Sequence, residues 1–181
     1  DVLPYYKKSE SYHRGADDYH SDQGEMLVQE QRLKWDVLET FKKVCEESGF
    51  TDRPDFNRGD NSGVGYFEVT QRKGVRWSSA RAFLRPVMHR PNLTVMTKTL
   101  TERLIFDGDR CTGMEGTRHG KPVLIQAERV VLAAGAVGSP SLLERSGIGS
   151  EAVLKPLGIP ILNRLEGVGK NLQDHLQVRL Q

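Results

Sequence analysis

The stretch that most constrains the fold of this chain is residues 130–149, VVLAAGAVGSPSLLERSGIG. It opens within a continuous apolar run, Arg129–Ala134, whose length suits a single strand. Such runs are typical of strands that are buried on both faces, as in parallel sheets. Gly135 and Gly138 follow the run, and glycine permits tight turning and close approach of a ligand to the backbone. The pattern therefore predicts a buried strand that ends in a glycine turn.

A short helix is expected after this turn. Ser139 is a good N-cap residue and Pro140 suits the first helical position, so we predict a helix over Ser141–Ser146 that ends at Gly147. A helix N-terminus presents unpaired N–H groups and the positive end of the helix dipole, which together suit a phosphate group. The residues leave two alternatives open: a nucleotide-binding edge, or a strand–turn–helix unit that binds no ligand.

The dinucleotide fingerprint G-x-G-x-x-G is missing from the sequence. Gly167-Val168-Gly169 is followed by Lys170-Asn171-Leu172, so the third glycine is lacking, and no predicted strand precedes it. The motifs of this chain therefore do not predict a complete flavin or nicotinamide site.

Composition excludes some classes of function. The 181 residues are 37% hydrophobic with a formal net charge of +2, which gives no electrostatic reason to expect a nucleic-acid partner. The basic run Arg72–Trp77 is interpreted as a turn. No apolar run reaches the ~20 residues of a transmembrane segment. The opening Asp1-Val2-Leu3-Pro4 shows no signal-peptide pattern and resembles a cut inside a longer chain. Cys45 and Cys111 are expected to be free thiols, which favours a reducing compartment.

The first half of the chain contains one strongly periodic segment. Residues 28–48 are predicted to form a helix that ends at Gly49, because apolar side chains recur on one face. We interpret this helix as core scaffolding. Its apolar face consists of Leu33, Val37, Phe41, Val44 and Cys45.

The segments around this helix are expected to be loops and short elements. Ser11–Gly24 is interpreted as a solvated loop, although it contains histidines and aspartates, because it lacks enough converging ligands for a metal. Those residues are His13, Asp17, Asp18 and His20. A strand is predicted over Tyr66–Gln71. A helix is predicted over Ala80–Leu84, capped by Ser78 or Ser79 and ending before Pro86.

A β-meander is predicted between residues 93 and 126. Leu93–Met96 is an apolar, β-branched strand candidate. Asp107-Gly108-Asp109 and His119-Gly120 are hairpin-turn signals. They separate three further predicted strands, which cover Thr99–Phe106, Cys111–Arg118 and Lys121–Gln126.

Residues 135–149, GAVGSPSLLERSGIG, also resemble the second signature of the glucose–methanol–choline (GMC) oxidoreductases. The match includes the small-residue turn, the Ser-Pro pair and the Ser-Gly-aliphatic-Gly end. Five further stretches are similar to this family in the same order: PYYKKSE, GVRWSSARAFL, RPNLTVMTKTLTERLIFDGDRCTGMEG, LGIPI and GVGKNLQDH. The resemblance covers nearly the whole chain and is greatest to the choline dehydrogenase-like and alcohol dehydrogenase-like branch.

The resemblance implies a flavoprotein that oxidises an alcohol by hydride transfer to FAD. In this family a Rossmann-like FAD domain and an antiparallel-sheet substrate domain are assembled from interleaved segments. The family's amino-terminal fingerprint, its first signature and its carboxy-terminal catalytic histidine have no match in this chain. The resemblance therefore assigns no catalytic residue and no metal ligand to these 181 residues.

The resemblance also implies which residues lie near the cofactor. Thr101 stands where the family's strand meets the adenine through backbone atoms, although the family usually has valine there. Ala134, Gly135 and Ala136 match the turn beside the ADP half, and Asn171, Asp174 and His175 match the loop beside the flavin. We interpret His175 as a loop-ordering residue rather than the catalytic base.

We therefore predict a mixed α/β chain that supplies parts of two domains. Residues 1–93, which include the helix 28–48, belong mainly to the substrate domain. Residues 94–149 belong to the FAD-binding domain, and residues 150–181 form a connecting segment with the flavin-side loop. Some of the C-terminal end enters the substrate domain.

The expected parent enzyme oxidises a small primary alcohol, with choline as one candidate, to an aldehyde. Neither the alcohol nor the electron acceptor follows from the sequence. A cytoplasmic location is expected, and peripheral membrane association is compatible with it. The alternatives are a stand-alone nucleotide-binding or interaction module without redox activity, and a nicotinamide-dependent reductase, against which the missing fingerprint argues.

Overall fold

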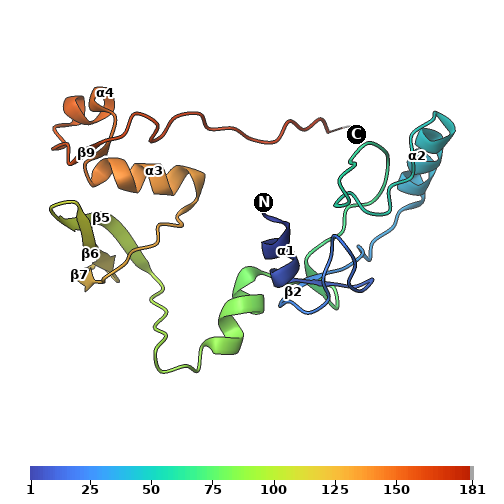
Figure 1. Ribbon diagram of the computed structural model, residues 1–181, viewed down its shortest axis with the longest axis horizontal. Coiled ribbons are helices and arrows are strands. Elements are labelled where there is room, and N and C mark those ends of the chain that lie inside the picture. The colour runs from blue at the N-terminus through green and yellow to red at the C-terminus, as the bar shows by residue number, and fades with distance from the viewer. Residues whose placement is uncertain (180–181) are drawn as a thin grey trace. The chain divides into compact units, whose positions relative to one another are not determined.

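The computed structural model describes residues 1–179 and divides the chain into two compact units, Asp1–Val95 and Met96–Gln181. Each unit combines short helices with small sheets (Figure 1), which confirms the prediction of a mixed α/β chain. The assignment of segments to an FAD domain and a substrate domain stays a prediction. Among residues 1–179, no helix combines the length and the apolar character needed to cross a membrane.

The first unit is built around a two-stranded parallel pair. Strand β1 (Glu10–Tyr12) follows helix α1 (Leu3–Ser9) and pairs with β2 (Met26–Val28). Gly24 makes this pairing sterically feasible, because a Cβ atom there would lie 2.3 Å from the backbone carbon of Ser9. The other elements of this unit are α2 (Asp36–Glu47), β3 (Gln71–Arg72), β4 (Val75–Arg76), η1 (Ala80–Leu84) and η2 (Arg85–Val87).

The helix predicted over residues 28–48 begins eight residues later than expected, at Asp36. Val28 is part of β2, and the backbone of Gln29 exchanges hydrogen bonds with that of Val69. These non-local pairings override the helical periodicity of the first residues. The prediction that this helix is core scaffolding is also wrong for the described chain, because α2 contains no buried residue.

Three shorter predictions in the first unit have mixed outcomes. The strand predicted over Tyr66–Gln71 is wrong except for an isolated bridge at Val69 and the start of β3. The turn at Arg72–Trp77 is confirmed as the β3–β4 hairpin. A helical segment does occupy Ala80–Leu84, but no side-chain cap bond precedes it, and a 3₁₀ turn continues it through Pro86.

The second unit contains the predicted meander. Strands β5 (Thr99–Asp107), β6 (Arg110–Arg118) and β7 (Lys121–Gln126) form an antiparallel sheet in that order. Gly116 is required opposite β5, because a Cβ atom there would lie 1.9 Å from the carbonyl oxygen of Leu100. The register shifts between Thr101 and Arg103, which leaves Glu102 as a bulge. The alternating pattern and the two turn signals therefore located these strands to within one residue.

Helix α3 packs on β5, and four short elements complete the described part of the unit (Figure 1). The contact is fixed by Ser146, whose Oγ accepts a 2.9 Å hydrogen bond from the Leu104 N–H and donates a 2.6 Å bond to the Leu142 carbonyl. The remaining elements are α3 (Gly135–Arg145), β8 (Ile148–Gly149), α4 (Glu151–Leu154), η3 (Lys155–Leu157) and β9 (Asn163–Arg164), which pairs with β8 in parallel.

The strand predicted over Arg129–Ala134 is wrong. The last meander bond joins the Ala127 N–H to the Thr112 carbonyl, and the chain then continues without a strand partner among residues 1–179, with Val131 89% exposed. Leu93–Met96, also predicted as a strand, is likewise unpaired in the described chain. A strand needs a hydrogen-bonding neighbour, so apolar composition alone did not determine the structure of either run.

Each unit has a small core. The buried hydrophobic side chains are Tyr12 and Ala82 in the first unit and Leu104, Leu142 and Leu154 in the second. Many large apolar side chains elsewhere are exposed, in both units. The described residues therefore bury much less apolar surface than a chain of this length usually does.

Candidate functional site

The N-terminus of α3 holds three of the predicted cofactor residues. The helix begins at Gly135, earlier than the predicted Ser141, and Ala134 is its N-cap. Gly135 has φ +80, a left-handed conformation that turns the chain directly from the extended run into the helix. The prediction that Ser139 is the N-cap is wrong, because Ser139 lies inside the helix, where its Oγ accepts a 3.0 Å hydrogen bond from the N–H of Ala134.

This helix end is open and electrostatically positive. Ala134, Gly135 and Ala136 are exposed, and no acidic side chain lies in the first turn. The first N–H groups of a helix have no intrahelical acceptor, and they carry the positive end of the dipole. Pro140 lies inside the helix rather than at its first position, where it removes a further N–H donor. At the other end, Gly147 terminates the helix with φ +84, as predicted.

Thr101 lies on an edge strand of the same unit. It is opposite Gly116 on β6, and β5 has no strand on its other side among the described residues. Because α3 packs on β5, the structure places the strand of Thr101 beside the helix that begins with Ala134–Ala136.

The other three predicted residues lie in the segment that follows β9. Asn171, Asp174 and His175 are exposed, and the His175 N–H donates a 2.8 Å hydrogen bond to Asp174 Oδ1. Asn171 is left-handed, with φ +56. No hydrogen bond within residues 1–179 links these three residues to Thr101 or to the α3 N-terminus. The structure therefore packs α3 against the strand of Thr101, but no hydrogen bond within residues 1–179 joins Thr101 to Ala134–Ala136, and the seven predicted residues are not brought together.

A glycine-rich loop connects that segment to α3. A Cβ atom at Gly169 would lie 3.1 Å from Glu144 Oε1, so the loop passes close to the C-terminal half of the helix. The turn over Gly167–Lys170 is closed by a 3.2 Å bond from the Lys170 N–H to the Gly167 carbonyl.

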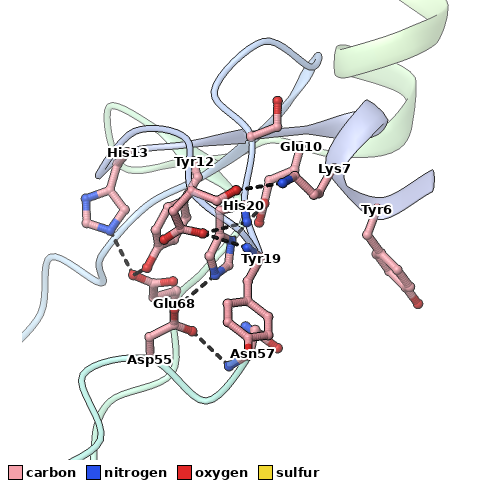
Figure 2. A network of polar contacts seen from close by, with 12 residues as sticks. Tyr6, Lys7, Glu10, Tyr12, His13, Tyr19, His20, Asp55, Asn57 and Glu68 are labelled. Atoms are coloured by element: carbon pink, nitrogen blue, oxygen red, sulfur yellow. Dashed lines mark hydrogen bonds and ion pairs between the residues drawn. The ribbon is translucent and has the colours of Figure 1, made fainter. Parts of the chain in front are cut away.

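Sequence reasoning missed a buried polar network in the first unit (Figure 2). His20, interpreted above as part of a solvated loop, is only 3% exposed. Its Nδ1 lies 2.8 Å from Glu10 Oε2 and its Nε2 lies 2.9 Å from Asp55 Oδ2. The imidazole also stacks on Tyr12 at a ring distance of 3.9 Å. Each ring nitrogen of His20 therefore faces one carboxylate oxygen within hydrogen-bond distance.

The carboxylates of this network are held in the charged state by their partners. Burial opposes ionisation of Asp55, but the Asn57 N–H, His20 and Arg58 outweigh it and hold the pKa of Asp55 below its ordinary value. Asp17 is half-buried, and the Tyr19 N–H together with the His20 N–H and Arg58 lowers its pKa to about 2. The loop is therefore closed by charge pairing.

A second part of the network surrounds Glu68. Its Oε1 accepts a 2.9 Å hydrogen bond from Tyr12 Oη and lies 2.8 Å from His13 Nε2 and 3.4 Å from Arg14 Nη2. Burial, followed by the bond to Glu68, raises the pKa of Tyr12. Glu68 Oε2 is buried without a hydrogen-bond partner in the described chain.

The network borders a pocket of about 780 Å³ whose lining includes Glu10, His20, Glu68 and the aromatic side chains of Tyr6, Tyr19 and Phe83. His20 has no free ring nitrogen with which to accept a substrate proton, so the arrangement supports a structural role for it. No group of histidine, cysteine and acidic side chains within residues 1–179 has the geometry of a metal site. No local signal identifies this network, because Glu10 and Asp55 lie 10 and 35 positions from His20.

Comparison with known proteins places this geometry in a family context. A family model described as GMC oxidoreductase matches residues 1–177. The chain is 37% identical to mitochondrial choline dehydrogenase of Mus musculus over 180 residues, which cover 99% of the chain and 30% of the relative. It is 39% identical over 183 residues to an oxygen-dependent choline dehydrogenase of Chromohalobacter salexigens, covering 99% of the chain and 33% of the relative.

One solved structure has the same fold over most of the chain. Pyridoxine 4-oxidase from Mesorbium loti superposes with a TM-score of 0.86 at 29% identity, over 91% of this chain and 33% of that one. The chain thus spans about a third of the length of the relatives it matches.

Proposed function

Because this chain belongs to the GMC oxidoreductase family, we propose that it forms part of an FAD-dependent enzyme that oxidises a small primary alcohol to the aldehyde. Choline is one candidate substrate, because two of the relatives described above are choline dehydrogenases. When bound, FAD supplies the hydride acceptor for such a reaction. The family match over residues 1–177 is the single observation that carries the proposal.

The α3 N-terminus fits the anionic half of this cofactor. Its first residues have no side chain larger than a methyl group until Val137, so a ligand can approach the backbone amides directly. The absence of an acidic residue in the first turn leaves the positive end of the helix dipole uncompensated. In this proposal Ala134, Gly135 and Ala136 hold the ADP portion through their backbone.

Thr101 is proposed to contribute through its main chain. It lies on the sheet edge next to α3, where backbone groups on the outer side have no strand neighbour among the described residues. The threonine side chain replaces the family's usual valine, and a main-chain contact tolerates that change. Asn171, Asp174 and His175 are proposed to border the flavin, and their exposed side chains are accessible for such a contact.

We further propose that the 181-residue chain alone is colourless and inactive. Its residues provide one wall of the cofactor site, whereas the family's pyrophosphate-binding fingerprint and catalytic histidine have no match in it. A base outside this chain would remove the hydroxyl proton, and the residues described here would orient the cofactor. The acceptor that reoxidises the flavin is not assigned, and a cytoplasmic location, with peripheral membrane association compatible, is part of the proposal.

The test is the visible absorption spectrum of two purified proteins. One is the 181-residue chain, and the other is a chimera in which this stretch replaces the matching third of the Chromohalobacter salexigens relative. We expect the first to be colourless and the second to be yellow and to reduce a dye when alcohol is added. Near-stoichiometric flavin on the chain alone would refute its proposed inactivity, whereas a folded but colourless chimera would refute the cofactor assignment.

A further inference from the structure

The pocket beside the His20 network combines aromatic walls with acidic side chains. Its volume of about 780 Å³ is within the range of small-molecule sites. The walls come from α1, β2, the loop that follows Asp55 and η1, so residues of the first unit alone form the pocket. Glu10 and Glu68 line it, and among the described residues no lysine or arginine does. The pocket therefore offers a ligand negative charge and aromatic surface.

Glu10 is the acid of this network that has no arginine or lysine beside it (Figure 2). Its Oε2 lies 2.8 Å from His20 Nδ1, and no hydrogen bond or ion pair within residues 1–179 uses its Oε1. The other acids, Asp17, Asp55 and Glu68, each pair with an arginine. The Glu10 side chain is 16% exposed, so a ligand in the pocket can reach its carboxylate. Glu10 thus has one acceptor oxygen available for a hydrogen-bond donor.

Two aromatic side chains of the pocket are also open to a ligand. Tyr6 is 68% exposed and Phe83 is 41% exposed, and within the described chain no cation lies over either ring. Tyr19 differs from them, because the Arg58 guanidinium already lies 5.9 Å from its ring centroid. The face of an aromatic ring attracts a cation within about 6 Å of its centroid. Tyr6 and Phe83 therefore favour an organic cation over a neutral or anionic ligand.

We infer that this pocket binds a protonated amine with an apolar body, whose N–H donates a hydrogen bond to Glu10 Oε1 while the body packs against Tyr6 and Phe83. A carboxylate only accepts hydrogen bonds, and a bond between an ammonium and a carboxylate is stronger than a neutral one. Glu68 Oε2, buried without a partner in the described chain, adds negative potential to the wall. A quaternary ammonium has the charge but no N–H, so it lacks the bond to Glu10.

The inference goes beyond the proposed function and is independent of it. The nitrogen of choline, the candidate alcohol substrate, is quaternary and does not meet the requirement for an N–H. The amine site also uses residues of the first unit, whereas the residues proposed to contact FAD all lie in the second. Failure of the flavin test and failure of the amine test are therefore separate outcomes.

The test is a calorimetric titration with two matched probes, benzylamine and benzyltrimethylammonium. They share the aromatic body and the positive charge and differ in the N–H donors. The titrations use the 181-residue chain, its Glu10→Gln and Tyr6→Leu variants, and Glu25→Gln as the control. Glu25→Gln makes the same charge change at an exposed residue that does not line the pocket. Folding of each variant is checked by urea unfolding, and the titrations are repeated on the Chromohalobacter chimera.

We expect benzylamine to bind one site with a Kd of about 1 mM or below. Binding should weaken about tenfold or more for benzyltrimethylammonium and for the Glu10→Gln variant, and about two- to fivefold for Tyr6→Leu. Glu25→Gln should bind as the wild type does. If Glu10→Gln does not fold, the ratio of the two probes on the wild type decides.

Four results overturn the inference. They are no saturable binding of benzylamine, equal affinity for the two probes, unchanged affinity in a folded Glu10→Gln variant, and binding to the chain that disappears in the chimera. The last result would mean that the remainder of a family-length protein fills the pocket. Binding of benzylamine to a folded but colourless chimera supports the amine site while it refutes the cofactor assignment.

Discussion

Removing the hydroxyl of Ser146 is expected to loosen the contact between α3 and β5. Ser146 is 3% exposed, and its Oγ is the acceptor for the N–H of Leu104, which is itself buried. In the Ser146→Ala variant that N–H has no partner, and an unsatisfied buried group costs about 1–3 kcal/mol. The Leu142 carbonyl loses the hydroxyl but keeps its bond from the Ser146 N–H, so it adds little to the cost.

The assay must report on the second unit alone. Both tryptophans, Trp35 and Trp77, lie in the first unit, so their fluorescence is blind to this change. Amide hydrogen exchange in peptides that cover β5 and β6 gives the opening free energy directly. We expect the opening constant to rise about 5- to 150-fold, which corresponds to about 1–3 kcal/mol.

Ser141→Ala is the matched control, because Ser141 lies on the same helix and is exposed. Its opening constant is expected to change by less than about 0.5 kcal/mol. If Ser146→Ala also stays within about 0.5 kcal/mol, the Leu104 N–H is satisfied in some other way. The link between helix and strand would then not depend on this serine.

Three further predictions concern single residues. His20→Gln breaks the buried contacts with two carboxylates, so we expect the first unit to lose about 3 kcal/mol or more in urea unfolding followed by tryptophan fluorescence. A loss below about 1 kcal/mol would contradict this. The folded-state pKa of Asp55 is lowered, so its contribution is fully present above the unfolded value of about 3.9 and is lost as pH falls through the folded value. Below about pH 4, the urea midpoint of the Asp55→Asn variant should therefore fall less with decreasing pH than the midpoint of the wild type does. Gly116→Ala forces a Cβ atom against the β5 backbone at Leu100, so it should destabilise the second unit by about 1–3 kcal/mol, measured by hydrogen exchange. Gly167→Ala is the control and should leave the exchange rates unchanged, because the space around Gly167 is open.

The meander was predictable because its information is local. Each strand of Thr99–Gln126 pairs with the next one along the chain, and glycine-containing turns mark the boundaries. Arg129–Ala134 carries an equally clear strand pattern, yet it is unpaired in the described chain. An apolar composition indicates that a segment is suited to burial in a sheet, but the segment forms a strand only where a neighbouring strand is available for hydrogen bonding.

In the candidate site and in the His20 network too, local patterns were insufficient where the backbone conformation or a distant segment determined the structure. The start of α3 was misplaced because the left-handed Gly135 initiates the helix, while capping propensity favoured Ser139. The early part of the predicted helix over residues 28–48 was lost to pairing with residues far away in sequence. His20 was missed for the same reason, because its two carboxylate partners come from distant segments. Motif spacing detects chemistry that is contiguous in sequence, and this network is not.

The two carboxylates that flank His20 also set a constraint on how this sequence can diverge. Replacing the histidine by an apolar residue would remove a buried polar partner from both Glu10 and Asp55, and replacing either acid by an apolar residue would leave one buried ring nitrogen of His20 without its partner. Single changes at any of the three sites are therefore costly, while a concerted change of all three is tolerable. Among homologous sequences we expect positions 10, 20 and 55 to covary as a triplet.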